Sequence, residues 1–155
     1  MDRVHIPPNV AHADTKVAVK KETSKTAAPS IEAAVYHPPK YVRDGGCEQY
    51  RKLIASHDWD VRVMMAVMEA ESTNYKVQPV IHCDSQVVGD NFPINGVLAV
   101  SCGLFQVRTV AEWRGTCDQL KDPEFNVDIA YRIYQGQGMS AWSAYTSGAY
   151  LKYLR

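Results

Sequence analysis

The sequence lacks a long apolar run, an excess of one charge and any Cys-x-x-Cys pair. No stretch approaches the ~20 consecutive apolar residues that a membrane span needs, and residues 1–8 lack the apolar region of a signal peptide. The chain has 17 basic residues (Lys and Arg) and 17 acidic residues (Asp and Glu), so its net charge is zero. This balance gives no support for nucleic-acid binding. We therefore expect no transmembrane segment, no recognisable signal peptide and no nucleic-acid partner.

Cysteine is scarce but even in number, at Cys47, Cys83, Cys102 and Cys117. Four cysteines permit two disulfides in three possible pairings, which would suit an extracytoplasmic protein, secreted or associated with a cell wall. A structural zinc site is the alternative to disulfides, because His82 adjoins Cys83. The sequence has no Cys-x-x-Cys pair, and adjacent ligands are poorly spaced for zinc. We therefore expect no metal and no cofactor. Cys102 is alternatively a free, buried thiol.

The chain divides by composition at about residue 43. Residues 1–43 carry Pro, Ala, Lys, Thr, Ser and Val without helical or strand periodicity, and such a segment buries too little apolar surface to offset its ordering entropy. With 46% hydrophobic residues overall, the remainder is long enough to build one core. We expect a disordered tail or linker over 1–43 and one domain over 44–155, acting as a monomer.

Periodicity within 44–155 predicts a mainly α (α+β) fold with a small β-hairpin lobe. Helices are expected over 47–57, over 61–71 with Asp58 or Asp60 as the cap, briefly through 110–113, and over 123–136 after Asp122. Residues 73–100 break the helical period and read as short strands separated by turns. A last helix is expected to carry the residues from Trp142 to Leu154.

The helix over 61–71 ends in two glutamates that face differently. Its apolar stripe consists of Val61, Met64, Met65 and Met68. At about 100° per residue, Glu71 lies roughly 60° from the centre of that stripe and Glu69 roughly 100° away, so Glu71 is expected inward and Glu69 outward. A carboxyl group against apolar surface has a raised pKa, which suits a general acid. The alternative is a helix-terminal glutamate that simply reaches water.

Four short segments follow one another in order: Glu71-Ser72, then Gly103-Leu104-Phe105-Gln106, then Asp122-Pro123 with Asn126, then Ala144-Tyr145 with Gly148. In this order they resemble the motifs of the soluble lytic transglycosylase family of the lysozyme-like superfamily, over about residues 47–154. The resemblance implies a lysozyme-like fold and cleavage of the MurNAc–GlcNAc bond of peptidoglycan glycan strands. It implies that Glu71 protonates the glycosidic oxygen and then, as base, helps the 6-hydroxyl of the sugar form a 1,6-anhydro product.

The same resemblance suggests further site residues. Gln106 corresponds to a residue that contacts the sugar, Tyr145 to a tyrosine beside the catalytic acid, and Ser72 to a residue that steadies the acid. We also name Ser101, just before Gly103, as a substrate-binding candidate. Without the resemblance, Gln106 would be interpreted as a helix-terminal amide, Tyr145 as a core tyrosine and Ser72 as a C-cap hydroxyl.

Two alternatives to a lytic transglycosylase remain open. A lysozyme-type hydrolase (muramidase) would need a second carboxylate, for which Asp84 and Asp90 are available, although both read more simply as solvated turn residues. A non-catalytic glycan-binding or virion structural module is suggested by Thr146, which replaces an expected Asn, and by the long spacing between Glu71 and Gly103. Trp113 and Trp142 are candidates for stacking on sugars, although core packing suits Trp142 better.

Overall fold

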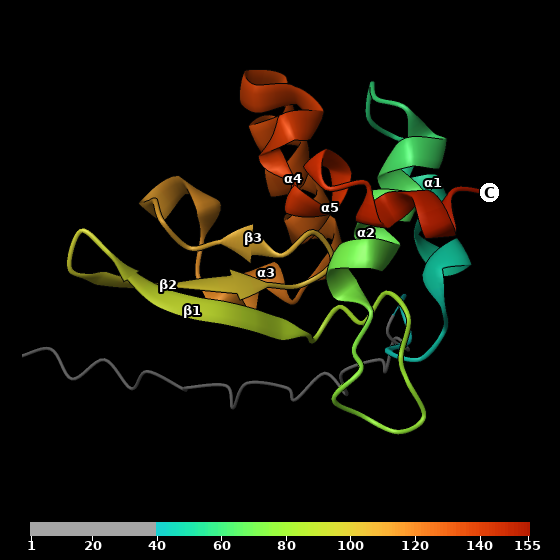
Figure 1. Ribbon diagram of the computed structural model, residues 1–155, viewed down its shortest axis with the longest axis horizontal. Coiled ribbons are helices and arrows are strands. Elements are labelled where there is room, and N and C mark those ends of the chain that lie inside the picture. Colours follow the sequence, from blue (N-terminus) through green and yellow to red (C-terminus); the bar gives the residue numbers. More distant parts are fainter. Residues whose placement is uncertain (1–39) are drawn as a thin grey trace, which may run out of the picture. The chain divides into compact units, whose positions relative to one another are not determined.

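The computed structural model describes residues 40–155, which form a set of mostly short helices and one three-stranded antiparallel sheet (Figure 1). This confirms the predicted mixture of mainly helical structure with a small β lobe. The prediction of a disordered tail over 1–43 falls almost entirely on residues outside the described part. Of its last four residues, Tyr41 packs its ring 5.1 Å from that of Tyr50, and Arg43 pairs with Asp84.

The expected helix over 47–57 is a 3₁₀ turn, η1 (Cys47–Tyr50), followed by the single turn α1 (Arg51–Ile54). The next helix, α2 (Val61–Ser72), matches the prediction closely. Of the two possible caps, the structure uses Asp60, whose side chain accepts a hydrogen bond from the backbone N–H of Val63 at 3.0 Å. That bond satisfies one of the backbone donors that the first turn of a helix leaves unpaired.

The helix α2 lies at the centre of the core. Its predicted apolar stripe is buried at Met64, Met65 and Met68, but Ala66 and Val67 on other sides are buried as well. The reason is that α2 packs against α1, against α5 (Ser143–Thr146) and against the 3₁₀ turn η4 (Ala149–Tyr153). A helix covered on several sides has no single face exposed to solvent, so polar residues of α2 such as Glu69 and Ser72 are buried too.

The β lobe is a hairpin with one short additional strand. Strand β1 (Val88–Ile94) pairs antiparallel with β2 (Val97–Cys102), and β2 pairs with β3 (Val107–Arg108), in the order β1-β2-β3. Asn95 and Gly96 both have positive φ at the hairpin turn, as a tight two-residue connection requires. The sheet projects to one side of the helices in Figure 1, and it confirms the predicted hairpin.

Two capped helices follow the sheet. The 3₁₀ turn η2 (Glu112–Arg114) stands where a short helix was expected, and a capping box at Thr116 starts α3 (Cys117–Leu120). Asp122 caps α4 (Pro123–Gln137), accepting from the N–H of Phe125 at 2.8 Å with Pro at the first position, as predicted. Trp59 fills the space beside α4, with its ring 5.3 Å from that of Tyr131.

The expectation of one last helix from Trp142 to Leu154 is wrong. The chain instead forms η3 (Gly138–Ala141), α5 and η4, separated by an extended residue at Trp142 and by Gly148 in the left-handed region (φ 77). Glycine is the residue that adopts this conformation at little strain. The break at Trp142 places the start of α5 against the end of α2.

Within residues 40–155, no helix is both long enough and apolar enough to cross a bilayer.

Candidate active site

Glu71 lies in the last turn of α2 and reaches across to the start of α5. Its Oε1 accepts a hydrogen bond from the backbone N–H of Ala144 at 3.1 Å. The first and last of the four ordered segments therefore meet at this carboxyl group, although 73 residues separate them in the chain. Burial raises the pKa of Glu71 above its ordinary value, while the Ala144 N–H and the positive charge of Arg108 act in the opposite direction.

A cleft of about 670 Å³ opens beside Glu71. One wall comes from the sheet, at Gly89, Asp90 and Ser101, and the other comes from the end of α4 through the start of α5, including Trp142 and Ser143. Its volume is in the range of small-molecule binding pockets, roughly 300–1,000 Å³. Glu71 and Asp90 are the two carboxylates among the described residues that line the cleft.

Gln106 lies on the cleft wall in a strained backbone position (φ 44). Its side-chain Nε2 donates to the carbonyl of Gly103 at 2.9 Å and to that of Val87 at 3.3 Å. A Cβ at Gly89 would stand 2.0 Å from Gln106 Oε1, so a larger residue there would displace this amide. The two hydrogen bonds to backbone carbonyls hold the amide in its orientation.

The role of Asn126 was missed by sequence reasoning, although its segment was recognised. Its fully buried side chain accepts from the N–H of Phe105 at 2.9 Å and donates to the carbonyls of Cys102 (3.0 Å) and Leu120 (2.8 Å). These three bonds hold the second segment against the start of α4. A Cβ at Gly103 (φ 73) would stand 2.1 Å from the carbonyl oxygen of Leu120, which explains why this position is glycine.

Of the other predicted site residues, Ser101 lines the cleft, whereas Ser72 and Tyr145 do not. Ser101 is nearly buried and lines the cleft. Ser72 is fully buried, with its hydroxyl donating to the carbonyl of Met68 at 2.6 Å. Tyr145 stacks on Tyr150 at 5.0 Å, and within residues 40–155 its hydroxyl makes no hydrogen bond to a protein atom. The substrate-binding roles of Ser72 and Tyr145 stay predictions.

The two tryptophans that were candidates for stacking on sugars differ in burial. Trp142 is buried in the core and donates its indole N–H to the carbonyl of Phe105 at 3.2 Å, as core packing requires. Trp113 is 43% exposed and lies outside the set of residues that line the cleft.

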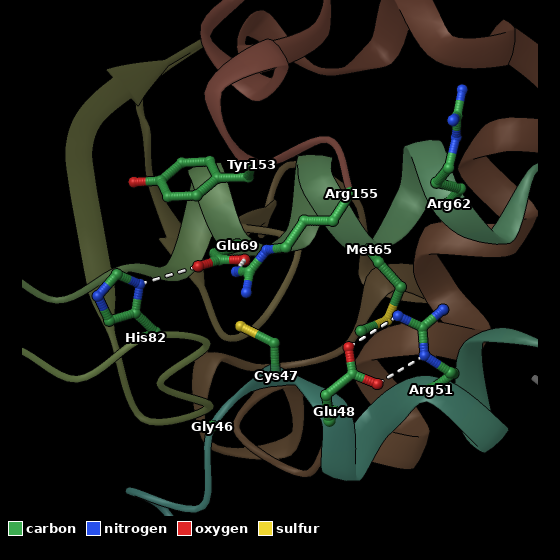
Figure 2. A pocket seen from close by; sticks show the side chains of 10 residues that line it. All are labelled: Gly46, Cys47, Glu48, Arg51, Arg62, Met65, Glu69, His82, Tyr153 and Arg155. Carbon is green, nitrogen blue, oxygen red and sulfur yellow. Dashed lines mark hydrogen bonds and ion pairs between the residues drawn. The ribbon is translucent and has the colours of Figure 1, made fainter.

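The prediction that Glu69 faces outward is wrong. Its side chain is nearly buried, accepting from Arg155 Nη2 at Oε2 (2.6 Å) and bonding His82 Nδ1 at Oε1 (3.0 Å) (Figure 2). Glu69 points away from the apolar stripe of α2, and an isolated helix would leave it in water. Here Arg155 covers that side of α2. Both carboxylate oxygens of Glu69 already have partners, so Glu69 is a structural residue in a separate pocket of about 360 Å³.

The interpretation of Asp84 as a solvated turn residue is also wrong. Asp84 is fully buried and receives two hydrogen bonds from Arg43, both 2.9 Å, one from Asn74 and one from the N–H of Gln86. Burial alone would raise the pKa of Asp84, but these hydrogen bonds outweigh it and hold the pKa below its usual value. Asp84 does not line the cleft, whereas the exposed Asp90 does.

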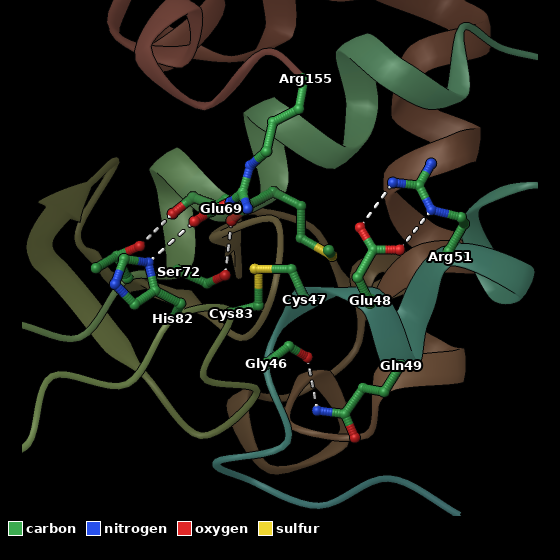
Figure 3. The surroundings of a disulfide bond; sticks show 12 residues. Gly46, Cys47, Glu48, Gln49, Arg51, Glu69, Ser72, His82, Cys83 and Arg155 are labelled. Carbon is green, nitrogen blue, oxygen red and sulfur yellow. Dashed lines mark hydrogen bonds and ion pairs between the residues drawn. A yellow bond between two sulfur atoms is a disulfide. The ribbon is translucent and has the colours of Figure 1, made fainter.

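Two disulfides join Cys47 to Cys83 and Cys102 to Cys117. They select one of the three possible pairings, and Cys102 is not a free thiol. The first bond lies beside Glu69 and His82, and it ties η1 to the loop after α2 (Figure 3). The second ties β2 to the start of α3. Among residues 40–155, no group of three His, Cys, Asp or Glu side chains is arranged to hold a metal ion.

A comparison with protein-family models matches residues 52–144, more than half of the chain, to a lysozyme-like domain. The chain belongs to this family. The match spans Glu71, the turn ending at Gln106 and the start of α4, and it confirms the resemblance to lysozyme-like proteins of the soluble lytic transglycosylase type. Searches of curated proteins and of solved structures returned no significant match. Membership of a lysozyme-like family indicates peptidoglycan-related glycan cleavage, and the two disulfides are compatible with an extracytoplasmic location.

Proposed function

We propose that this protein is a peptidoglycan lytic transglycosylase in which Glu71 is the catalytic acid and base. The observation that carries the proposal is the position of Glu71, a carboxyl group with a burial-raised pKa at the wall of a cleft of about 670 Å³. A glutamate in this state keeps its proton to a higher pH than an exposed one, which suits it to act as a general acid.

The reaction needs one carboxyl group. Glu71 gives its proton to the glycosidic oxygen between MurNAc and GlcNAc, and the bond from that oxygen to the anomeric carbon breaks. The resulting carboxylate accepts the proton of the MurNAc 6-hydroxyl as its oxygen bonds the anomeric carbon, which leaves a 1,6-anhydro end. The N–H of Ala144, 3.1 Å from Glu71, stabilises the carboxylate between the two proton transfers.

The other predicted site residues have supporting roles in this proposal, two at the cleft and two behind it. Gln106 and Ser101 line the wall that faces the sugar, with Gln106 fixed by two backbone carbonyls. Tyr145 follows Ala144 on the same short helix and would keep α5 in register through its stacking on Tyr150. Ser72 would act through α2, because its hydroxyl bonds the helix backbone.

A hydrolase of the lysozyme type is the second candidate, and Asp90 is the observation that favours it. Asp90 lies on β1 and lines the same cleft as Glu71, which is where a second carboxylate would activate a water molecule or stabilise charge. The mass of the released products separates the two reactions. An anhydro end is lighter by one water molecule than the reducing end that hydrolysis leaves.

The test compares Glu71→Gln with Glu112→Gln, the same chemical change at an exposed glutamate. Glu71→Gln should fold, because it replaces a half-buried carboxyl with a neutral group of equal size whose amide oxygen can still accept from Ala144. It should lose at least about 100-fold in the rate of fragment release from purified sacculi. Glu112→Gln should match the wild-type rate. Retained activity in Glu71→Gln refutes the role of Glu71, and a wild-type protein that binds sacculi without releasing fragments supports a non-catalytic module.

A further inference from the structure

Two arginines occupy the cleft beside the proposed catalytic acid. Arg108 ends strand β3 and Arg114 ends η2, and both line the same cleft as Glu71. Arg114 Nη1 donates to the carbonyl of Arg108 at 3.4 Å, so the two side chains belong to one local structure. Sequence reasoning gave neither residue a role.

Neither arginine has a carboxylate partner within the described part of the chain. No Asp or Glu oxygen of residues 40–155 comes within 4.0 Å of a guanidinium nitrogen of Arg108 or Arg114. The Nε atom of each is buried from solvent and has no hydrogen-bond partner. A buried polar donor without a partner is unfavourable, so the Nε atoms carry a cost in the folded state, and a ligand in the cleft would be met by the terminal nitrogens of the two groups.

Aromatic rings fix the orientation of both guanidinium groups. The guanidinium carbon of Arg108 lies 4.3 Å from the centre of the Phe92 ring, and that of Arg114 lies 5.1 Å from the centre of the Trp113 ring. Burial lowers the pKa of Arg114, and the positive charge of Arg108 lowers it further. Two oriented cations that repel each other favour an anion in the space that they share.

We propose that Arg108 and Arg114 form a subsite for a carboxylate group of the glycan substrate. A guanidinium group presents paired N–H donors whose spacing matches the two oxygens of a carboxylate, which makes such contacts stronger than neutral hydrogen bonds. Peptidoglycan carries carboxylates and chitin carries none, so this subsite would select peptidoglycan over a neutral glycan of the same sugar backbone. The inference rests on the proposed function only for the class of glycan bound.

Two sources supply such a carboxylate: the stem peptide, and the lactyl group of MurNAc when the peptide has been removed. Three ligands separate them. They are a muropeptide oligomer with intact stems, the same glycan stripped by an amidase so that its lactyl carboxylates are free, and a neutral GlcNAc oligomer of equal length.

The experiment measures the binding of each ligand by calorimetry to the Glu71→Gln protein, which removes turnover but keeps the cleft. Arg108→Gln and Arg114→Gln are then added one at a time. The matched control is Arg132→Gln, because Arg132 also lies over the Trp113 ring (4.7 Å) but does not line the cleft. The fold of every variant is checked by circular dichroism and thermal unfolding.

We expect each cleft variant to weaken the binding of at least one carboxylated ligand about tenfold or more, with the neutral oligomer and Arg132→Gln unchanged. The ligand that loses affinity identifies the source of the carboxylate. Equal losses for all three ligands, no loss for either carboxylated ligand, or no binding of either overturns the proposal. If a glutamine variant fails to fold, the corresponding lysine variant replaces it, and rising salt must weaken carboxylated ligands more than the neutral one.

Failure of the subsite can be told apart from failure of the catalytic assignment. An active Glu71→Gln enzyme would refute the role of Glu71, and the arginine-dependent binding would stand unaffected. If Glu71→Gln is inactive as expected but the arginine substitutions leave ligand binding unchanged, only the subsite is refuted.

Discussion

Replacing Asn126 with alanine should destabilise the protein by about 4 kcal/mol. The substitution removes one acceptor and two donors from a fully buried site, leaving the N–H of Phe105 and the carbonyls of Cys102 and Leu120 without this partner. Each orphaned buried group costs about 1–3 kcal/mol, and water entering the space left by the amide would recover part of that loss. For a domain of this size, the result is a fall of roughly 15 °C in Tm.

The assay is urea and thermal unfolding followed by circular dichroism. Asn91→Ala is the matched control, since Asn91 is exposed on β1 and a change there should stay within about 0.5 kcal/mol. Fragment release measured well below the Tm should also fall in Asn126→Ala, because the turn that carries Phe105 and Gln106 loses its anchor. A loss of less than about 1 kcal/mol would refute the reasoning that this amide holds the turn.

The isosteric Asn126→Asp variant refines the same prediction. It keeps the acceptor for Phe105 but turns a carboxylate oxygen toward two backbone carbonyls, which repels them and raises the pKa of the new carboxyl group. A group whose pKa is raised on folding destabilises the folded state progressively as pH rises above the unfolded value. The stability deficit of Asn126→Asp relative to wild type should therefore be small at about pH 3 and grow toward pH 7, and a deficit independent of pH would contradict this account.

Three further outcomes follow from the structure. Removing the charge in Arg108→Gln should move the alkaline limb of the pH profile of kcat to higher pH, because the positive charge of Arg108 lowers the pKa of Glu71; an unmoved limb would count against Glu71 as the acid. Replacing Cys47 and Cys83 together with alanine opens a loop of 36 residues and should cost about 4 kcal/mol in urea unfolding, so an unchanged midpoint would contradict it. Asp84→Asn should lose about 2 kcal/mol at pH 7, less than a fully buried pair because its arginine partner is half exposed. Since the folded pKa of Asp84 is lowered, this difference must shrink as pH falls below about 4, and a constant difference would show that charge is not involved.

The predictable part of the fold followed from local signals. The stripe on α2, the cap and proline at α4 and the period break before the hairpin each depend on neighbours along the chain, and each is present in the structure. The predicted last helix failed because a glycine and an extended tryptophan interrupt it, and helical spacing of apolar residues does not reveal such a break.

The parts of the site that escaped prediction depend on contacts between distant segments. Glu69 is buried by Arg155, 86 residues later, and Asp84 is paired with Arg43, 41 residues earlier, so neither burial is encoded near the residue itself. The three backbone bonds of Asn126 and the pairing of Arg108 with Arg114 in one cleft likewise need the folded chain. The inward direction of Glu71 was predicted from its own helix, because it depends on the apolar stripe beside it, and the structure turns this half-buried side chain toward Ala144.

The catalytic role of Glu71 is tested most directly by mass spectrometry of the soluble products from purified sacculi incubated with wild-type protein or with Glu71→Gln. We expect muropeptides with 1,6-anhydro MurNAc ends from the wild type and none from Glu71→Gln. The same anhydro products from the Glu71→Gln protein would contradict it.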